Sequence, residues 1–141
     1  MKATVDQLLN DAEINYLADL FLAHLRADKA TRGYRLLRNA VILYSHGAWQ
    51  IDRVYSLIAA CADISELEAK SEIARTINGL ETPPHEAFNR VYAPPDIPYD
   101  NRPIKITMPE ELDPNQTIEF LGVVFSYLIV TNYPKYEYLE N

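Results

Sequence analysis

The chain has 141 residues, 48% of them hydrophobic, and a formal net charge of −7 from 13 basic and 20 acidic residues. This length suits one domain, and this hydrophobic content can fill a core, which excludes an intrinsically disordered chain. A single cysteine excludes an internal disulfide and a multi-cysteine zinc cluster, and the acidic balance disfavours bulk nucleic-acid binding, which depends on neutralising phosphates.

The first predicted helical segment covers Val5 to Leu25. Apolar residues recur along it at three- and four-residue spacing, as on one face of an amphipathic helix. Thr4 and Gln7 form a capping-box pattern at its start, and Asp11–Glu13 mark a predicted break. A second helix is predicted from Thr31 to Ser45.

A third helix is predicted from Gln50 to Ala60, and a fourth follows closely. Ser65 and Glu68 form a second capping box that opens the fourth helix, and Asn78-Gly79 supplies its C-terminal signal. The link between the two helices, Cys61–Ile64, has the short length that is typical of a helix-turn-helix. The sequence therefore predicts a helical unit of helix-turn-helix type.

The second half of the chain is built differently, because all nine prolines fall in residues 83–141. Proline fixes φ and disfavours helix at the residue before it. We therefore predict an extended connection from Thr82 to Pro114, with at most one short strand at Pro103–Met108. Residues 83–141 also carry 4 basic and 9 acidic residues, so most of the net negative charge lies there.

A last regular element is predicted near the C-terminus. Asp113-Pro114 is typical of a helix start. The apolar run Ile118–Val130 predicts a buried helix or a strand, and periodicity does not decide between them. The tyrosine-rich tail at residues 133–138 is expected to pack on its own domain rather than on a partner. The predicted fold is mainly α, with a helical domain over residues 1–82 and a Pro-rich acidic extension over 83–141 that packs on it.

Two sequence motifs resemble a known family. Residues 33–41 read Gly-Tyr-Arg-Leu-Leu-Arg-Asn-Ala-Val, and residues 54–59 read Val-Tyr-Ser-Leu-Ile-Ala. They resemble the Gly-Tyr helix and the Leu-Tyr-Pro-x-Ile-Ala segment in the DNA-binding C-terminal effector domain of the sporulation initiation response regulator of spore-forming bacteria. The resemblance covers residues 21–77, and it implies a helix-turn-helix fold and duplex DNA as a partner.

The chain departs from this family on the helix that reads DNA. The family has arginines there, whereas this chain has Glu68, Ser71 and Ala74 in the same register. Lys70 and Arg75 are the only cations between residues 65 and 80. A recognition helix needs donors that reach base edges, and carboxylates are repelled by nearby phosphates. The resemblance therefore implies the fold but does not carry base readout to this helix.

A cationic cluster surrounds the start of the second helix. Arg32, Arg35 and Arg38 recur at three-residue spacing, which places them along one helix flank. Contacts to phosphates position a protein on DNA without reading sequence. The alternative interpretation is a solvated face that pairs with the acidic C-terminal region. The candidate nucleic-acid-binding residues are Arg26, Lys29, Arg32, Arg35, Arg38, Lys70 and Arg75.

No catalytic constellation is predicted. His24, His46 and His85 have no metal-ligand spacing, and the four glycines do not form a phosphate-cradling loop. Cys61 has apolar neighbours, so we expect a buried, inert thiol. We predict a protein that is not an enzyme, without catalytic residues, metal or cofactor.

Two function hypotheses remain. The first is a small regulator that binds DNA through the basic helix flank, with a homodimer as an option. The second is an acidic protein-binding inhibitor, of the phage or mobile-element type such as an anti-CRISPR protein, which occupies a cationic nucleic-acid-binding surface of a partner. Its candidate residues are Glu66, Glu68 and Glu72, on adjacent turns of the fourth helix. The resemblance favours the first hypothesis, and the charge pattern favours the second.

The sequence also predicts a cytoplasmic protein without a membrane partner. The longest apolar run, at residues 120–130, is about half of the roughly 20 residues that a spanning helix needs. The first eleven residues lack the apolar core of a secretory signal.

Overall fold

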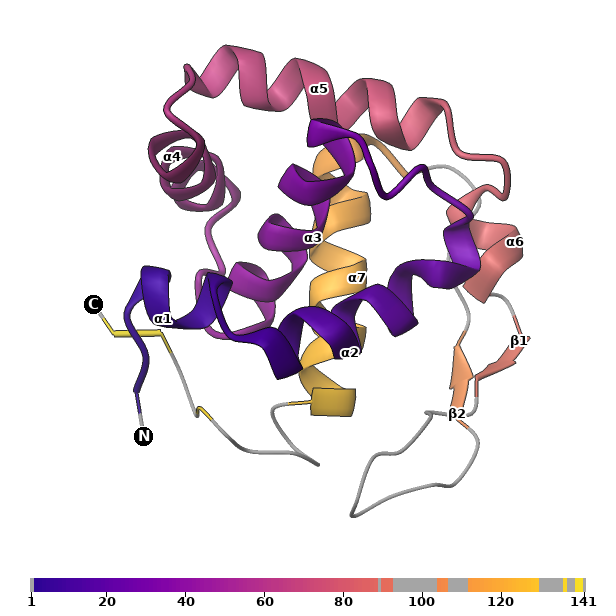
Figure 1. Ribbon diagram of the computed structural model, residues 1–141. Helices are drawn as coiled ribbons and strands as arrows, with labels where there is room; N and C mark the ends of the chain where they lie inside the picture. Colours follow the sequence, from indigo (N-terminus) through magenta and orange to yellow (C-terminus); the bar gives the residue numbers. More distant parts are fainter. Residues whose placement is uncertain are drawn as a thin grey trace.

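A computed structural model describes residues 2–88, 90–92, 104–106, 112–129, 136 and 139–140. This part of the chain is mainly helical, which confirms the predicted fold class. Helix α3 (Arg32–Ser45) runs through the middle of the molecule, and the other long helices surround it (Figure 1). Its buried apolar side chains form the centre of the hydrophobic core; they include Leu36, Leu37, Ala40, Val41, Ile42 and Leu43.

The first helical segment breaks where the sequence predicted. The Thr4 hydroxyl accepts from the Gln7 N–H at 3.2 Å, and the Gln7 side chain accepts from the Thr4 N–H at 2.9 Å, which completes the capping box. Asp11 caps the second helix, because its carboxylate accepts from two backbone N–H groups of the first turn, at 3.1 and 3.0 Å. The elements are α1 (Val5–Leu9), α2 (Ala12–Leu22) and the 3-10 turn η1 (Ala23–Leu25).

Helices α4 (Ile51–Ala62) and α5 (Glu66–Asn78) follow α3, and both pack on it. The turn between them contains Asp63 in the left-handed conformation, with φ 56°. The Ser65 hydroxyl accepts from the Glu68 N–H at 3.1 Å, which caps α5. This is the arrangement of two consecutive helices that the helix-turn-helix prediction describes.

The proline-rich connection contains more regular structure than predicted. Helix α6 (Pro84–Phe88) begins at a proline, whose fixed φ and missing N–H suit the first helical position. The prediction of at most one strand is also wrong, because β2 (Ile104–Ile106) pairs antiparallel with β1 (Arg90–Tyr92), with Val91 opposite Lys105. Three residues are too few to show a strand's alternation, so the sequence did not reveal β1. Six of the nine prolines lie outside the described residues.

The apolar run near the C-terminus is a helix, α7 (Pro114–Ile129), which decides the alternative that periodicity left open. Asp113 and Gln116 form a reciprocal capping box at 2.8 and 3.1 Å, and Pro114 takes the first helical position, as predicted. Helix α7 packs along α3 (Figure 1). Its buried residues Ile118, Leu121 and Phe125 join the common core.

Described residues near the C-terminus lie against the N-terminal segment. The Leu139 N–H donates to the His46 carbonyl at 2.6 Å, and the Glu140 N–H donates to the Ala3 carbonyl at 2.7 Å. The Tyr136 hydroxyl donates to the Asp11 carboxylate at 3.2 Å. These contacts hold the two ends of the chain side by side (Figure 1). The other tyrosines of the tail lie outside the described residues.

Candidate nucleic-acid interface

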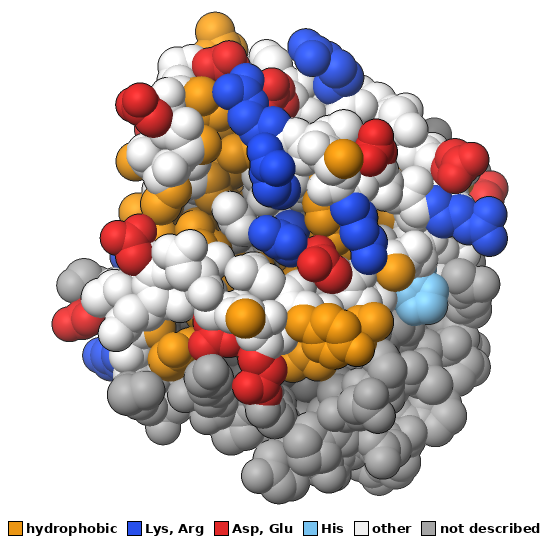
Figure 2. All heavy atoms as spheres, in the orientation of Figure 1, with side chains coloured by type: hydrophobic (Ala, Val, Ile, Leu, Met, Phe, Trp, Pro, Cys, Tyr) orange, Lys and Arg blue, Asp and Glu red, His pale blue; other side chains and the backbone are white. Residues whose placement is uncertain are grey.

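The cationic cluster lies at the start of α3 and in the loop before it. The Thr31 hydroxyl caps α3 by accepting from the Tyr34 N–H at 3.2 Å, which fixes where the helix begins. Arg32, Arg35 and Arg38 then follow one flank of the helix. In Figure 2, Lys and Arg side chains gather in a band over α3 and the loop before it, with Asp and Glu side chains among and around them. We call the surface formed by Arg26, Lys29, Arg32, Arg35 and Arg38 the cationic band.

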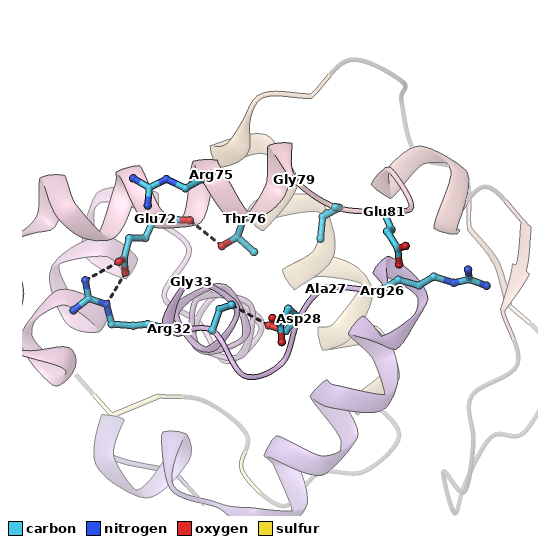
Figure 3. Close-up of a pocket in the computed structure, with 12 residues that line it drawn as sticks. Arg26, Ala27, Asp28, Arg32, Gly33, Glu72, Arg75, Thr76, Gly79 and Glu81 are labelled. Atoms are coloured by element: carbon cyan, nitrogen blue, oxygen red, sulfur yellow. Dashed lines mark hydrogen bonds and ion pairs between the residues drawn. The ribbon is translucent and has the colours of Figure 1, made fainter.

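Arg32 is held by carboxylates of α5. Its guanidinium donates to both oxygens of Glu72, at 2.6 and 2.7 Å, and to Glu68 at 3.1 Å (Figure 3). The Arg32 hydrogen bonds lower the pKa of the Glu72 carboxyl, and the same bonds raise the pKa of Arg32. No acidic residue of α3 itself lies in its first turn, so the carboxylates of α5 offset the cation at the positive end of the helix.

Arg38 is also occupied, in a network between α2 and α3. Its guanidinium donates to the Asp19 carboxylate at 3.2 and 3.3 Å, and the Tyr34 hydroxyl donates to the same carboxylate at 2.6 Å. Burial raises the pKa of the Tyr34 hydroxyl, and its hydrogen bond to Asp19 raises it further. This network holds α2 against α3, so Arg38 acts mainly in packing.

The remaining candidate cations are exposed and have no ion-pair partner among the described residues. Arg26 takes the left-handed conformation with φ 53°, just after η1, and Lys29 lies in the loop that follows. Arg35 lies on α3 between the two paired arginines. Arg75 lies on α5, and the Lys70 ammonium lies 5.3 Å from the centre of the Tyr55 ring, a cation–π contact.

An open cleft of about 680 Å³ lies between the loop before α3 and the C-terminal half of α5. Gly33 and Thr76 both line it where α3 and α5 are in contact, and a Cβ at Gly33 would overlap the Thr76 hydroxyl. Three arginines and three carboxylates are among the lining residues, some of which are labelled in Figure 3. The lining of the cleft therefore carries charges of both signs; these residues are Arg26, Arg32, Arg75, Asp28, Glu72 and Glu81.

A second groove of about 410 Å³ runs along the other side of the arginine row, between α1, α3 and α4. Arg35 and Asn39 line it from α3, and Cys61 lines it from α4. Cys61 is exposed, so the prediction of a buried thiol is wrong. Partial burial raises the pKa of the Cys61 thiol, and the nearby Asp6 carboxylate raises it further.

Helix α5 presents a mixed surface at the place where a recognition helix would approach bases. Glu66 and Leu67 are exposed on its first turn, and the Leu67 side chain is 75% exposed. Glu68 and Glu72 point to Arg32 instead, so two of the three carboxylates proposed for protein binding are engaged within the chain. The sequence did not reveal this pairing, because the partners are 36 and 40 residues apart and meet only where α3 and α5 cross.

Comparisons with protein-family models, with curated proteins and with solved structures find no match to this chain. No helix among the described residues is both long enough and apolar enough to cross a membrane. In the same part of the chain, no group of three or more His, Cys, Asp or Glu side chains is placed to hold a metal ion.

Proposed function

We propose that this protein is a small, non-enzymatic cytoplasmic regulator that binds duplex DNA through the cationic band. One observation carries the proposal: Arg26, Lys29 and Arg35, at the start of α3 and in the loop before it, are exposed and have no ion-pair partner among the described residues. Ammonium and guanidinium groups in this arrangement suit phosphate contacts.

The proposed binding follows the DNA backbone and does not read sequence. The first turn of α5 carries Glu66 and Glu68, which repel phosphates beside a groove that the helix would enter. Most of the net negative charge lies elsewhere, because residues 83–141 hold 9 acidic and only 4 basic residues. The cationic band is thus a local exception on an acidic chain.

Salt-dependent binding to a mixed-sequence duplex tests this proposal. We expect wild-type affinity to fall as salt rises, and the variant with Arg26→Ala, Lys29→Ala and Arg35→Ala to show a shallower slope of log K against log salt. The expected change is about 0.9 for each cation that contacts a phosphate. Lys2→Ala, which removes an exposed cation outside the candidate set, should leave the slope unchanged. No binding at low salt, or an unchanged slope in the triple variant, would overturn the proposal.

The carboxylates of α5 are expected to compete with DNA for Arg32. We predict that Glu68→Gln with Glu72→Gln strengthens duplex binding and steepens the salt slope by about one phosphate contact. Arg32→Ala should have little effect in the wild type but should remove this gain in the double glutamine variant. Filter binding over a salt series measures both effects. An equal effect of Arg32→Ala in the two backgrounds would show that these carboxylates do not restrain the arginine.

A second candidate function is the acidic protein-binding inhibitor, now restricted to the first turn of α5. The observation that favours it is the exposed pair of Glu66 and Leu67, an anionic group beside an apolar one. Such a pair fits a partner surface that has cations around an apolar pocket. Failure to bind the duplex, together with retention of a protein partner that depends on Glu66, would favour this function over the first.

A further inference from the structure

The groove between α1, α3 and α4 has the size and the lining of a small-ligand site. Helices α1 and α4 lie on the same side of α3 (Figure 1), and side chains of all three helices line a space of about 410 Å³. Small-ligand sites usually measure roughly 300–1,000 Å³ and combine an apolar lining with a few polar groups. The floor of this groove is apolar, because the lining residues Leu9, Leu36 and Ile58 are buried in the core.

The wall that α3 contributes carries three arginines, which differ in their ion pairs. Arg32 is held by Glu72 of α5, and Arg38 is held by Asp19 of α2. Arg35 is exposed and has no ion-pair partner in the described part of the chain. Its planar guanidinium can donate two parallel hydrogen bonds to a phosphate. Arg35 is therefore the cation of the groove that is available to an anionic ligand.

Two lining residues of α3 also contain a buried polar atom that has no hydrogen-bond partner in the described structure. The Nε–H of Arg38 is a donor, and Oδ1 of Asn39 is an acceptor. Buried polar groups of this kind are unfavourable unless they are paired. The Asn39 side chain as a whole is half-buried, and rotation of its amide presents either the oxygen or the NH₂ group to the groove. A ligand with both donors and acceptors would satisfy this wall.

We propose that this groove binds a free nucleotide, with the phosphate on the Arg35 guanidinium and the base over the apolar floor. The edge of a base carries donors and acceptors side by side, and an asparagine amide can pair with both. The inference goes beyond duplex binding, because a single nucleoside monophosphate carries all of the groups that the groove recognises. Arg35 belongs to the cationic band as well, so a bound nucleotide would compete with DNA for this side chain.

The single cysteine of the chain provides a probe of the groove, because Cys61 is exposed and belongs to its lining. Alkylation of the full chain by N-ethylmaleimide, an uncharged reagent, is followed while each of the common nucleoside monophosphates is titrated in turn. We expect at least one of them to slow the alkylation in a saturable way, with a Kd of about 1 mM or below. The matching uncharged nucleoside should protect Cys61 much less, since it has no group for Arg35.

Four variants test the residues of the groove. Arg35→Ala is expected to raise the nucleotide Kd by at least about tenfold, because it removes the charge-assisted hydrogen bonds. Asn39→Asp should weaken binding too, since it adds a carboxylate to the wall. Asp6→Asn removes the one acidic residue in the described lining and should lower the Kd about two- to fivefold. Arg75→Ala is the matched control, because Arg75 is exposed on α5 outside this lining and its loss should leave the Kd unchanged.

A short duplex in the same assay separates this inference from the proposed DNA binding. Salt-dependent duplex binding by a chain whose Cys61 no nucleotide protects would overturn the groove site alone. Nucleotide protection without duplex binding would support the groove site and overturn the DNA-binding proposal. Protection that persists unchanged in Arg35→Ala and in Asn39→Asp would contradict the placement of the nucleotide in this groove.

Discussion

Replacing Phe125 by alanine is expected to lower the free energy of unfolding by about 3–5 kcal/mol. Phe125 is fully buried on α7, and its ring lies 5.5 Å from the ring of Phe21 on α2, centre to centre. The substitution removes a large side chain from a core that cannot close completely around the cavity. Urea denaturation followed by circular dichroism measures the loss.

Two further variants keep this prediction informative if the alanine variant does not fold. Phe125→Leu preserves most of the volume and should cost less than about 1.5 kcal/mol. A cycle with Phe21→Leu should show a coupling of about 1 kcal/mol for the ring pair. Leu67→Ala, at a site that is 75% exposed, should change stability by less than about 0.5 kcal/mol. Equal losses at Leu67 and Phe125 would contradict the packing of α7 into the common core.

The starts of the helices could be predicted because their signals are local. Five helices are capped by a side-chain oxygen that accepts a hydrogen bond from a backbone N–H two or three residues ahead; the capping residues are Thr4, Asp11, Thr31, Ser65 and Asp113. A capping side chain satisfies a donor that the helix leaves free, so its effect is readable within a few positions of sequence. The same reasoning does not reach α6 or β1, where the elements are too short for periodicity to appear.

Whether the apolar run in α7 forms a helix or a strand could not be predicted from its own residues. Its β-branched and aromatic content suits a strand, and packing against α3 decides in favour of the helix. Gly122 lies at a close contact between the two helices, because a Cβ at this position would overlap the Tyr44 side chain of α3. No local pattern specifies a contact between residues so far apart in sequence.

The candidate site was predictable in outline only. Three-residue spacing correctly placed Arg32, Arg35 and Arg38 on one flank of a helix. Which of these arginines forms an ion pair depends on how the helices pack. Glu72 on α5 reaches Arg32, and Asp19 on α2 reaches Arg38. Arg35 lies between these crossings, and for that reason it has no ion-pair partner among the described residues.

Replacing Gly122 by valine is expected to lower the free energy of unfolding by about 2–3 kcal/mol. A Cβ at this position would lie 2.5 Å from Cδ1, 2.8 Å from Cβ and 2.9 Å from Cγ of Tyr44. These separations are shorter than van der Waals contact, and the Tyr44 Cβ cannot rotate away. Helices α3 and α7 would have to move apart, which weakens the core between them. Thermal and urea denaturation measure the change, and Ser71→Val, on an exposed position of α5, is the control.

The effect of Gly122→Ala on the free energy of unfolding distinguishes the close contact with Tyr44 from the general helix propensity of glycine. In the middle of a helix, glycine to alanine normally stabilises by about 1 kcal/mol, because alanine loses less backbone entropy. At Gly122 we expect alanine to destabilise, since its Cβ alone meets the Tyr44 side chain. Tyr44→Ala removes two of the three short separations, and should therefore reduce the penalty of Gly122→Val by about half. A stabilising alanine at Gly122 would mean that α3 and α7 are farther apart, and that this glycine is not what sets their spacing.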